Sequence, residues 1–186
     1  MTVVQNRAIT RVKLSQLASR MLKAGRLSTD TYLELAKDKS ANGQAIAVLF
    51  LATLGYSIGY TLLIGPLALD SILVGILTYL IISLMAGLLW AITTFLVGTK
   101  LFKGKTGFWG LARPLFFASS PGILFVLIAI PQDLISRGVA AAVAIWIVAC
   151  GVVALKTAMG FSYQRSMLTY IVGFLVGIAI SYFFGR

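Results

Sequence analysis

Few residues in this sequence have side chains that could carry out catalysis or ligate a metal. The chain contains no histidine and a single cysteine, Cys150, among its 186 residues. These counts exclude histidine-ligated haem and zinc, an intrachain disulfide, and the serine–histidine and cysteine–histidine pairs of nucleophilic catalysis. Cys150 lies within a long apolar stretch, where cysteine usually serves as a small packing residue. We therefore predict no catalytic residue, no cofactor site and no metal site, in a protein that is not an enzyme.

The polar chemistry that remains is basic, and it is concentrated between Gly98 and Gly122. Lys100, Lys103 and Lys105 lie among glycines, and Arg113 follows near the start of an apolar stretch. The segment lacks the GxxxxGK[ST] spacing of a phosphate-binding loop and the strand that precedes one, so we do not predict nucleotide binding. Basic side chains beside a bilayer instead favour contact with lipid phosphates.

A proline interrupts the apolar stretch that follows Arg113. Pro121 removes one backbone donor and frees the carbonyl of Phe117 from its helical hydrogen bond. Ser119 and Ser120 can satisfy such groups locally. A broken helix can also form a substrate site in a transporter, but no acid, histidine or lysine accompanies this break. The sequence favours a kink repaired by serine and by neighbouring helices over a solute site.

Five long apolar stretches must position these groups. The chain is 59% hydrophobic and 11% charged, whereas an ordinary soluble domain carries about 25% charged residues. A membrane-spanning helix needs roughly 20 mainly apolar residues. We predict an all-α, polytopic membrane protein in which a five-helix transmembrane bundle (44–186) follows a cytoplasmic N-terminal arm (1–43). The expected spans are residues 44–65, 72–97, 108–130, 138–158 and 167–184.

The number of lysines and arginines alternates between high and low in the successive gaps between these spans. Eight precede the first span, and the successive gaps and the tail hold none, three, one, two and one, where Lys156 at the end of the fourth span is counted with the gap that follows it. The positive-inside rule then places the N-terminus in the cytoplasm and the C-terminus outside. We expect a prokaryotic cytoplasmic membrane. Orientation is a sufficient reason for the net charge of +11, so we predict no nucleic-acid partner.

The arm contains a predicted amphipathic helix at residues 13–24. Lys13, Arg20 and Lys23 share its polar face, opposite a face of leucine, alanine and methionine. A basic amphipathic helix beside a bilayer indicates contact with anionic lipid of the cytoplasmic leaflet. Packing on the cytoplasmic ends of the bundle is the alternative, and the two are compatible.

A second, shorter helix is predicted at residues 31–39. Thr31 and Glu34 have the spacing of a capping box at its start. Its interleaved acids and lysines are typical of a solvated face, with a face for a basic partner as the alternative. The arm has no early apolar stretch of the kind found in a signal peptide.

Small residues recur at every fourth position in three of the expected spans. Helices in lipid associate through close backbone approach, which small side chains permit. The glycines of these series are Gly55, Gly59, Gly87, Gly173 and Gly177. We predict a compact bundle, in which one of these seams could instead serve a homo-oligomer or another membrane-protein subunit.

Two stretches of the chain carry a family pattern. Between Gly104 and Gly122 the order is Gly-Lys, Phe108, Leu111, Arg113 and then Phe-Ala-Ser-Ser-Pro-Gly, and residues 146–167 contain a tryptophan, Ala-Leu-Lys, Phe-Ser and an arginine. In these stretches the chain resembles the prokaryotic branch of the Yip family of Ypt/Rab-interacting membrane proteins.

The resemblance covers roughly residues 30–184. It implies five spans and a cytoplasmic N-terminus. The Asp-Leu-x-Gly-Pro motif that precedes the first span of eukaryotic members is absent, so Rab binding is not carried over.

These observations predict a non-enzymatic integral membrane protein that acts as a scaffold, assembly factor or accessory subunit through lipid and protein contacts. The alternative is a passive channel or facilitator for a small solute, with Ser119, Ser120 and Pro121 lining its path. Ion-coupled transport usually requires buried ionisable groups, and apart from Arg113 near the start of the third span no charged residue lies in the interior of a span.

Overall fold

The described part of the chain is helical throughout. The computed structural model describes residues 3–64, 68–130 and 133–184, with side chains from residue 14 to residue 179 of these ranges, and they contain no strand. Four helical segments are long and apolar enough to cross a membrane, which is compatible with an integral membrane protein. The all-α prediction is confirmed at this level. The four segments are Lys39–Ile64, Leu69–Leu101, Phe108–Ala129 and Asp133–Met159.

The N-terminal arm forms a helical hairpin that differs in its limits from the sequence prediction. Helix α1 (Val3–Gly25) begins earlier than residue 13, and α2 is Thr29–Lys37. Thr31 does not cap α2, because Ser28 has extended backbone angles and its hydroxyl accepts from the backbone N–H of Thr31 at 3.4 Å. The cap lies one turn earlier than the capping box predicted, and the helix begins with it.

The remaining helices follow the predicted apolar stretches with shifted ends. A 3₁₀ turn, η1, precedes α3, and a π-helical turn, η2, follows α4. The predicted end of the first span at residue 65 lies outside the described residues. The bounds are η1 Lys39–Ala41, α3 Asn42–Ile64, α4 Leu69–Leu96, η2 Val97–Leu101, α5 Phe108–Ala118, η3 Ser120–Ala129, α6 Asp133–Met159 and α7 Tyr163–Phe184.

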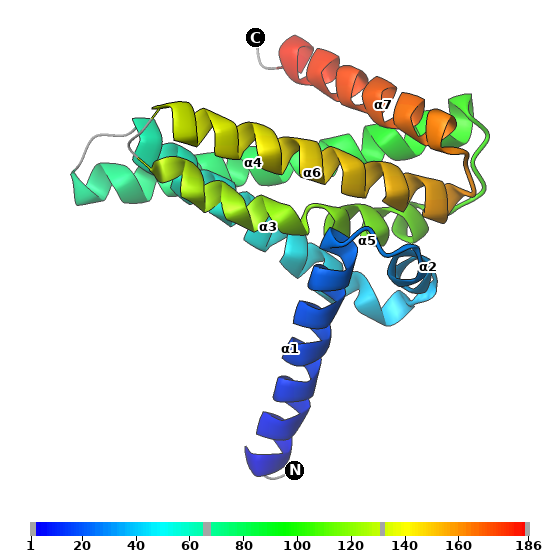
Figure 1. Cartoon of the computed structure of the whole chain (residues 1–186), viewed down its shortest axis with the longest axis horizontal. Helices are drawn as coiled ribbons and strands as arrows, with labels where there is room; N and C mark the ends of the chain where they lie inside the picture. The colour runs from blue at the N-terminus through cyan, green and yellow to red at the C-terminus, as the bar shows by residue number, and fades with distance from the viewer. Residues whose placement is uncertain (1–2, 65–67, 131–132, 185–186) are drawn as a thin grey trace.

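The long helices run alongside one another, and α1 crosses them and projects away from the bundle (Figure 1). α5 lies at the centre, where every residue from Leu111 to Ala118 is buried. It packs against α3 and α6 within the bundle and against α2 of the arm. The last turns of α1 and helix α2 therefore lie against the bundle, whereas the start of α1 points away from it (Figure 1).

The closest approach in the bundle joins α3 to η3. A Cβ added to Gly55 would lie 2.6 Å from the carbonyl oxygen of Ile123, and one added to Gly59 would overlap the carbonyl of Phe125. Backbone packs directly on backbone here, which only glycine allows.

The other predicted glycines lie on the faces of α4 and α7. A Cβ on Gly173 would lie 2.6 Å from the hydroxyl of Thr94, and one on Gly87 would lie 3.1 Å from the side chain of Leu49. Gly177 has more room, since its added Cβ would lie 3.6 Å from the nearest described side chain. α7 is therefore packed more closely at Gly173 than at Gly177.

Candidate functional site

A buried arginine ties the two arm helices to α3. The guanidinium of Arg20 donates to Glu34 Oε1 at 2.5 Å, to Asp38 Oδ2 at 2.7 Å and to Gln44 Oε1 at 2.7 Å. Arg20 is only 6% exposed. The prediction that it contacts lipid from the polar face of α1 is corrected, because α2 folds against that face and supplies two carboxylates.

The charges of this cluster stabilise one another. Hydrogen bonds from Ser40 and Arg20 hold the pKa of Asp38 below its ordinary value of 3.8. Burial alone would lower the pKa of Arg20, but hydrogen bonds and the charges of Glu34 and Asp38 raise it above its ordinary value. The pair of Arg20 and Asp38 therefore remains charged over the physiological pH range.

A second buried arginine holds the end of α2 on α5. Arg113, 4% exposed, donates from Nη2 to the carbonyl of Ala36 at 2.7 Å. Its Nη1 donates to the carbonyl of Asp38 at 2.8 Å and to Asn42 Oδ1 at 3.3 Å. The last carbonyls of a helix have no hydrogen-bond donor within it, and the guanidinium supplies donors to carbonyls at the end of α2. Arg113, which the sequence grouped with the loop lysines as a lipid or partner contact, is therefore also a clamp inside the protein.

The loop lysines remain at the surface. Lys100, Lys103 and Lys105 are exposed, and the backbone of Lys103 has a φ of 57°, in the left-handed region. Lys23 is exposed on α1, whereas the side chain of Lys13 lies outside the described part. The predicted basic cluster is thus divided into exposed lysines and buried arginines.

A basic pocket opens beside Arg113, at the start of α5. Its volume is about 480 Å³, and its lining includes Lys37, Lys39, Arg113 and Thr106. No carboxylate is among the residues that line it. The sequence interpretation missed Lys37 and Lys39, because only the return of α2 onto α5 brings them to this place. The available signal for this pocket was an arginine at the start of an apolar span with no acid near it in sequence.

The predicted break of the third span is present. α5 ends at Ala118, and the chain continues as the 3₁₀ helix η3. The backbone N–H of Ser119 donates to the carbonyls of Phe116 and Phe117, and its hydroxyl also donates to Phe116 at 2.6 Å. Local donors thus compensate for the hydrogen bond that Pro121 removes.

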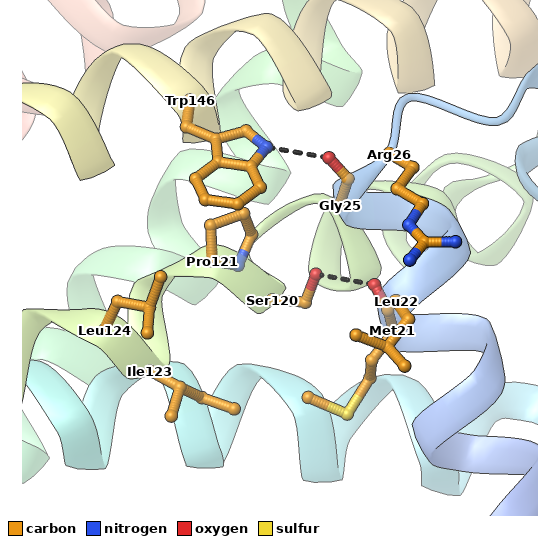
Figure 2. A pocket seen from close by; sticks show the side chains of 9 residues that line it. All are labelled: Met21, Leu22, Gly25, Arg26, Ser120, Pro121, Ile123, Leu124 and Trp146. Atoms are coloured by element: carbon orange, nitrogen blue, oxygen red, sulfur yellow. Dashed lines mark hydrogen bonds between the residues drawn. The ribbon is translucent and has the colours of Figure 1, made fainter.

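The break also receives the last turn of α1. Figure 2 shows Ser120 and Trp146 pointing toward that turn: the hydroxyl of Ser120 donates to the carbonyl of Met21 at 3.1 Å, and Trp146 Nε1 donates to that of Gly25 at 2.7 Å. Pro121 lines the same pocket, whose volume is about 450 Å³. The exposed carbonyls at the end of α1 find donors on two bundle segments, so this junction positions the arm.

Metal-ligating side chains do not gather in the described part of the chain. No three of its histidine, cysteine, aspartate and glutamate side chains lie together in a way that could hold a metal ion. Cys150 is buried, with its sulfur 3.6 Å from the carbonyl of Ala24. The buried arginines and the basic pocket offer anion-binding and docking chemistry.

Comparison with known proteins adds no relative: no protein-family model, curated protein or solved structure matches this chain.

Proposed function

We propose that this chain is a non-enzymatic integral membrane protein that acts as a scaffold, assembly factor or accessory subunit through lipid and protein contacts. The observation that carries the proposal is the arm: α1 projects from the bundle (Figure 1), while buried Arg20 and Arg113 fix the hairpin behind it. A helix held by so many charge-assisted hydrogen bonds keeps one direction. It can therefore present its basic residues to a membrane surface or a partner in a constant position.

The proposed topology has five spans, with the N-terminus inside and the C-terminus outside. α7 would be the fifth span, in addition to the four segments named above. The second and fourth gaps, which carry most of the basic residues that follow the first span, lie together in space, and this supports the arrangement. Gly104 of the second gap lies against Phe161 of the fourth. The connection into α5 and the turn between α6 and α7 lie at the right-hand end of the bundle in Figure 1. Basic loops gathered at one end agree with a cytoplasmic face.

Anionic lipid and a membrane-protein partner are the proposed contacts. The exposed side chains of Lys100, Lys103 and Lys105 support an electrostatic contribution from the second gap. The resemblance to the prokaryotic Yip family stays a prediction that agrees with this role.

The test is removal of the exposed charges alone. Lys100, Lys103 and Lys105 are changed together to glutamine, and Arg113 is kept because it is structural. Proteins and lipids that co-purify from native membranes are then identified by mass spectrometry. We expect anionic lipids or a stable protein partner to be depleted, whereas Arg137→Gln, which removes a charge from the third gap, leaves the profile unchanged. An identical profile for the triple variant and the unmodified protein would contradict the proposal.

A passive facilitator for a small solute is the second candidate, and one cavity favours it. This cavity, of about 470 Å³, is lined by Ser119 of the broken span and by Tyr56, Tyr60 and Tyr79. Hydroxyl groups on an otherwise apolar wall suit a small polar solute. Flux measured with the purified protein in liposomes tests this, and the absence of any solute or ion flux would remove the candidate.

A further inference from the structure

One hydrogen-bond donor of the Arg113 guanidinium has no acceptor among the described residues. Nη1 and Nη2 are bonded to the end of α2 and to Asn42, but no described group accepts from the Nε–H, which is buried. A buried donor on a charged group without an acceptor is costly, and structures usually satisfy it with a ligand, an ion or water. Arg113 lines the basic pocket, so the side chain with the unused donor borders an open volume.

The start of α5 forms the second wall of this pocket. The residue at its N-cap is Gly107, which makes no side-chain cap, and Gly107 and Trp109 both line the pocket. The first N–H groups of a helix have no acceptor within it, and the helix dipole makes this end partly positive. Helix starts of this kind bind phosphate.

The charged side chains that line the pocket are all positive. Lys37 and Lys39 line it together with Arg113, and the carboxylate nearest in sequence, that of Asp38, is bonded to Arg20 and Ser40 instead. Thr106 adds a hydroxyl to the lining. Three cations, a helix start and an unused guanidinium donor are the groups that recognise a multiply hydrogen-bonding anion.

We propose that this pocket binds a phosphate group. The group can come from the headgroup of an anionic phospholipid or from a soluble phosphate. Trp109, an interfacial type of residue, is exposed at the rim and would lie at headgroup level in the proposed topology. The inference rests on the proposed membrane placement, and it adds a phosphate site at Lys37, Lys39 and Arg113 to the surface contact proposed for the loop lysines.

The experiment titrates the full-length protein in neutral detergent micelles by calorimetry at constant ionic strength. One titrant is inorganic phosphate, and the other is dioctanoyl phosphatidic acid. The pocket variant is Lys37→Gln with Lys39→Gln. The matched control is Lys100→Gln with Lys103→Gln, which removes the same charge from exposed positions outside the pocket.

We expect saturable binding of at least one titrant and a loss of roughly ten-fold or more in the pocket variant, because charge-assisted hydrogen bonds are lost. The control should stay within about two-fold, since distant exposed charges are screened. Binding of phosphatidic acid alone assigns a lipid headgroup, and comparable binding of inorganic phosphate assigns a soluble phosphate.

The proposal is overturned if neither titrant saturates, or if the pocket and control variants lose affinity equally. Either result, together with a depleted partner profile for the loop-lysine variant in native membranes, would refute the phosphate site and leave the scaffold function standing.

Discussion

At the scale of single residues, two arginines define the arm–bundle connection. Arg20 and Arg113 are the buried basic side chains of the described part, and each satisfies carbonyl or carboxylate groups from other segments. Taking a charge out of water costs several kcal/mol unless good geometry offsets it. Removal of the Arg113 guanidinium would take a donor from the carbonyl of Ala36, and removal of the Arg20 guanidinium would break the link from α1 to Glu34 and Asp38. Both positions should therefore be sensitive to substitution.

Arg113→Gln should destabilise the protein strongly. The carbonyls of Ala36 and Asp38 would both lose the guanidinium donor, and that of Asp38 would keep only the N–H of Ala41, at a total cost of about 3 kcal/mol. Reversible unfolding in mixed micelles, followed by circular dichroism, measures the change. Arg137→Gln is the control, because that side chain is exposed and its described ion pair is with similarly exposed Asp133, and it should have little effect. Equal stability of the two variants would argue against the clamp.

Docking of the arm should weaken at acid pH. The pKa of Asp38 is lowered in the folded protein, so the ionised carboxylate contributes stability above its ordinary pKa of 3.8. This contribution is lost as the pH falls through the lower, folded-state pKa. Fluorescence of Trp146, whose Nε1 bonds the end of α1, should be constant above about pH 5 and change in this acid range. Asp38→Asn should abolish that part of the transition, and an unaltered acid transition in the variant would exclude Asp38 as its cause.

At the scale of elements, the contact between α3 and η3 is the tightest seam. Ten residues of 3₁₀ helix are an unusually long run, because the geometry of its hydrogen bonds is poorer than in an α-helix. Direct packing of the η3 backbone on Gly55 and Gly59 supports it. The break in the third span is thereby stabilised from a neighbouring helix as well as by its own serines.

Gly59→Ala should disrupt this seam. The new methyl group would overlap the carbonyl of Phe125, and the two helices would have to separate, at a cost of roughly 1–3 kcal/mol. Gly43→Ala in the same helix is the matched control, since its added Cβ meets nothing within 4 Å. The control should be neutral or slightly stabilising, because alanine favours the helix. Thermal unfolding in detergent compares the two, and a stable Gly59→Ala variant would refute backbone-on-backbone packing at this place.

At the scale of the whole molecule, the basic gaps gather at one end of the bundle. Cysteine labelling tests whether this end is cytoplasmic, because the native Cys150 is buried and gives a low background. We expect Arg137→Cys to react with a membrane-impermeant maleimide in intact cells and Lys103→Cys to react only after permeabilisation. The reverse pattern would invert the topology, and labelling of both in intact cells would contradict the assigned spans.

Sequence reasoning by itself determined the features that depend on local chemistry. Apolar stretches of membrane length predict helices wherever they occur, and Pro121 breaks a helix because it lacks an N–H. The broken third span could therefore be located without a structure, although its continuation as a 3₁₀ helix could not. That continuation depends on the glycines of α3, far away in the sequence.

Only the tertiary structure decided which basic residues share a site. Arg20 and Arg113 carry the same sequence signal as exposed basic residues, and their burial depends on the return of α2 onto α5 and α6. The same return brings Lys37 and Lys39 to the start of α5. The number of basic residues in each gap is enough to predict the orientation of the chain in a bilayer. Recognition of an anion requires hydrogen-bond donors from distant segments to converge, and only the fold brings them together.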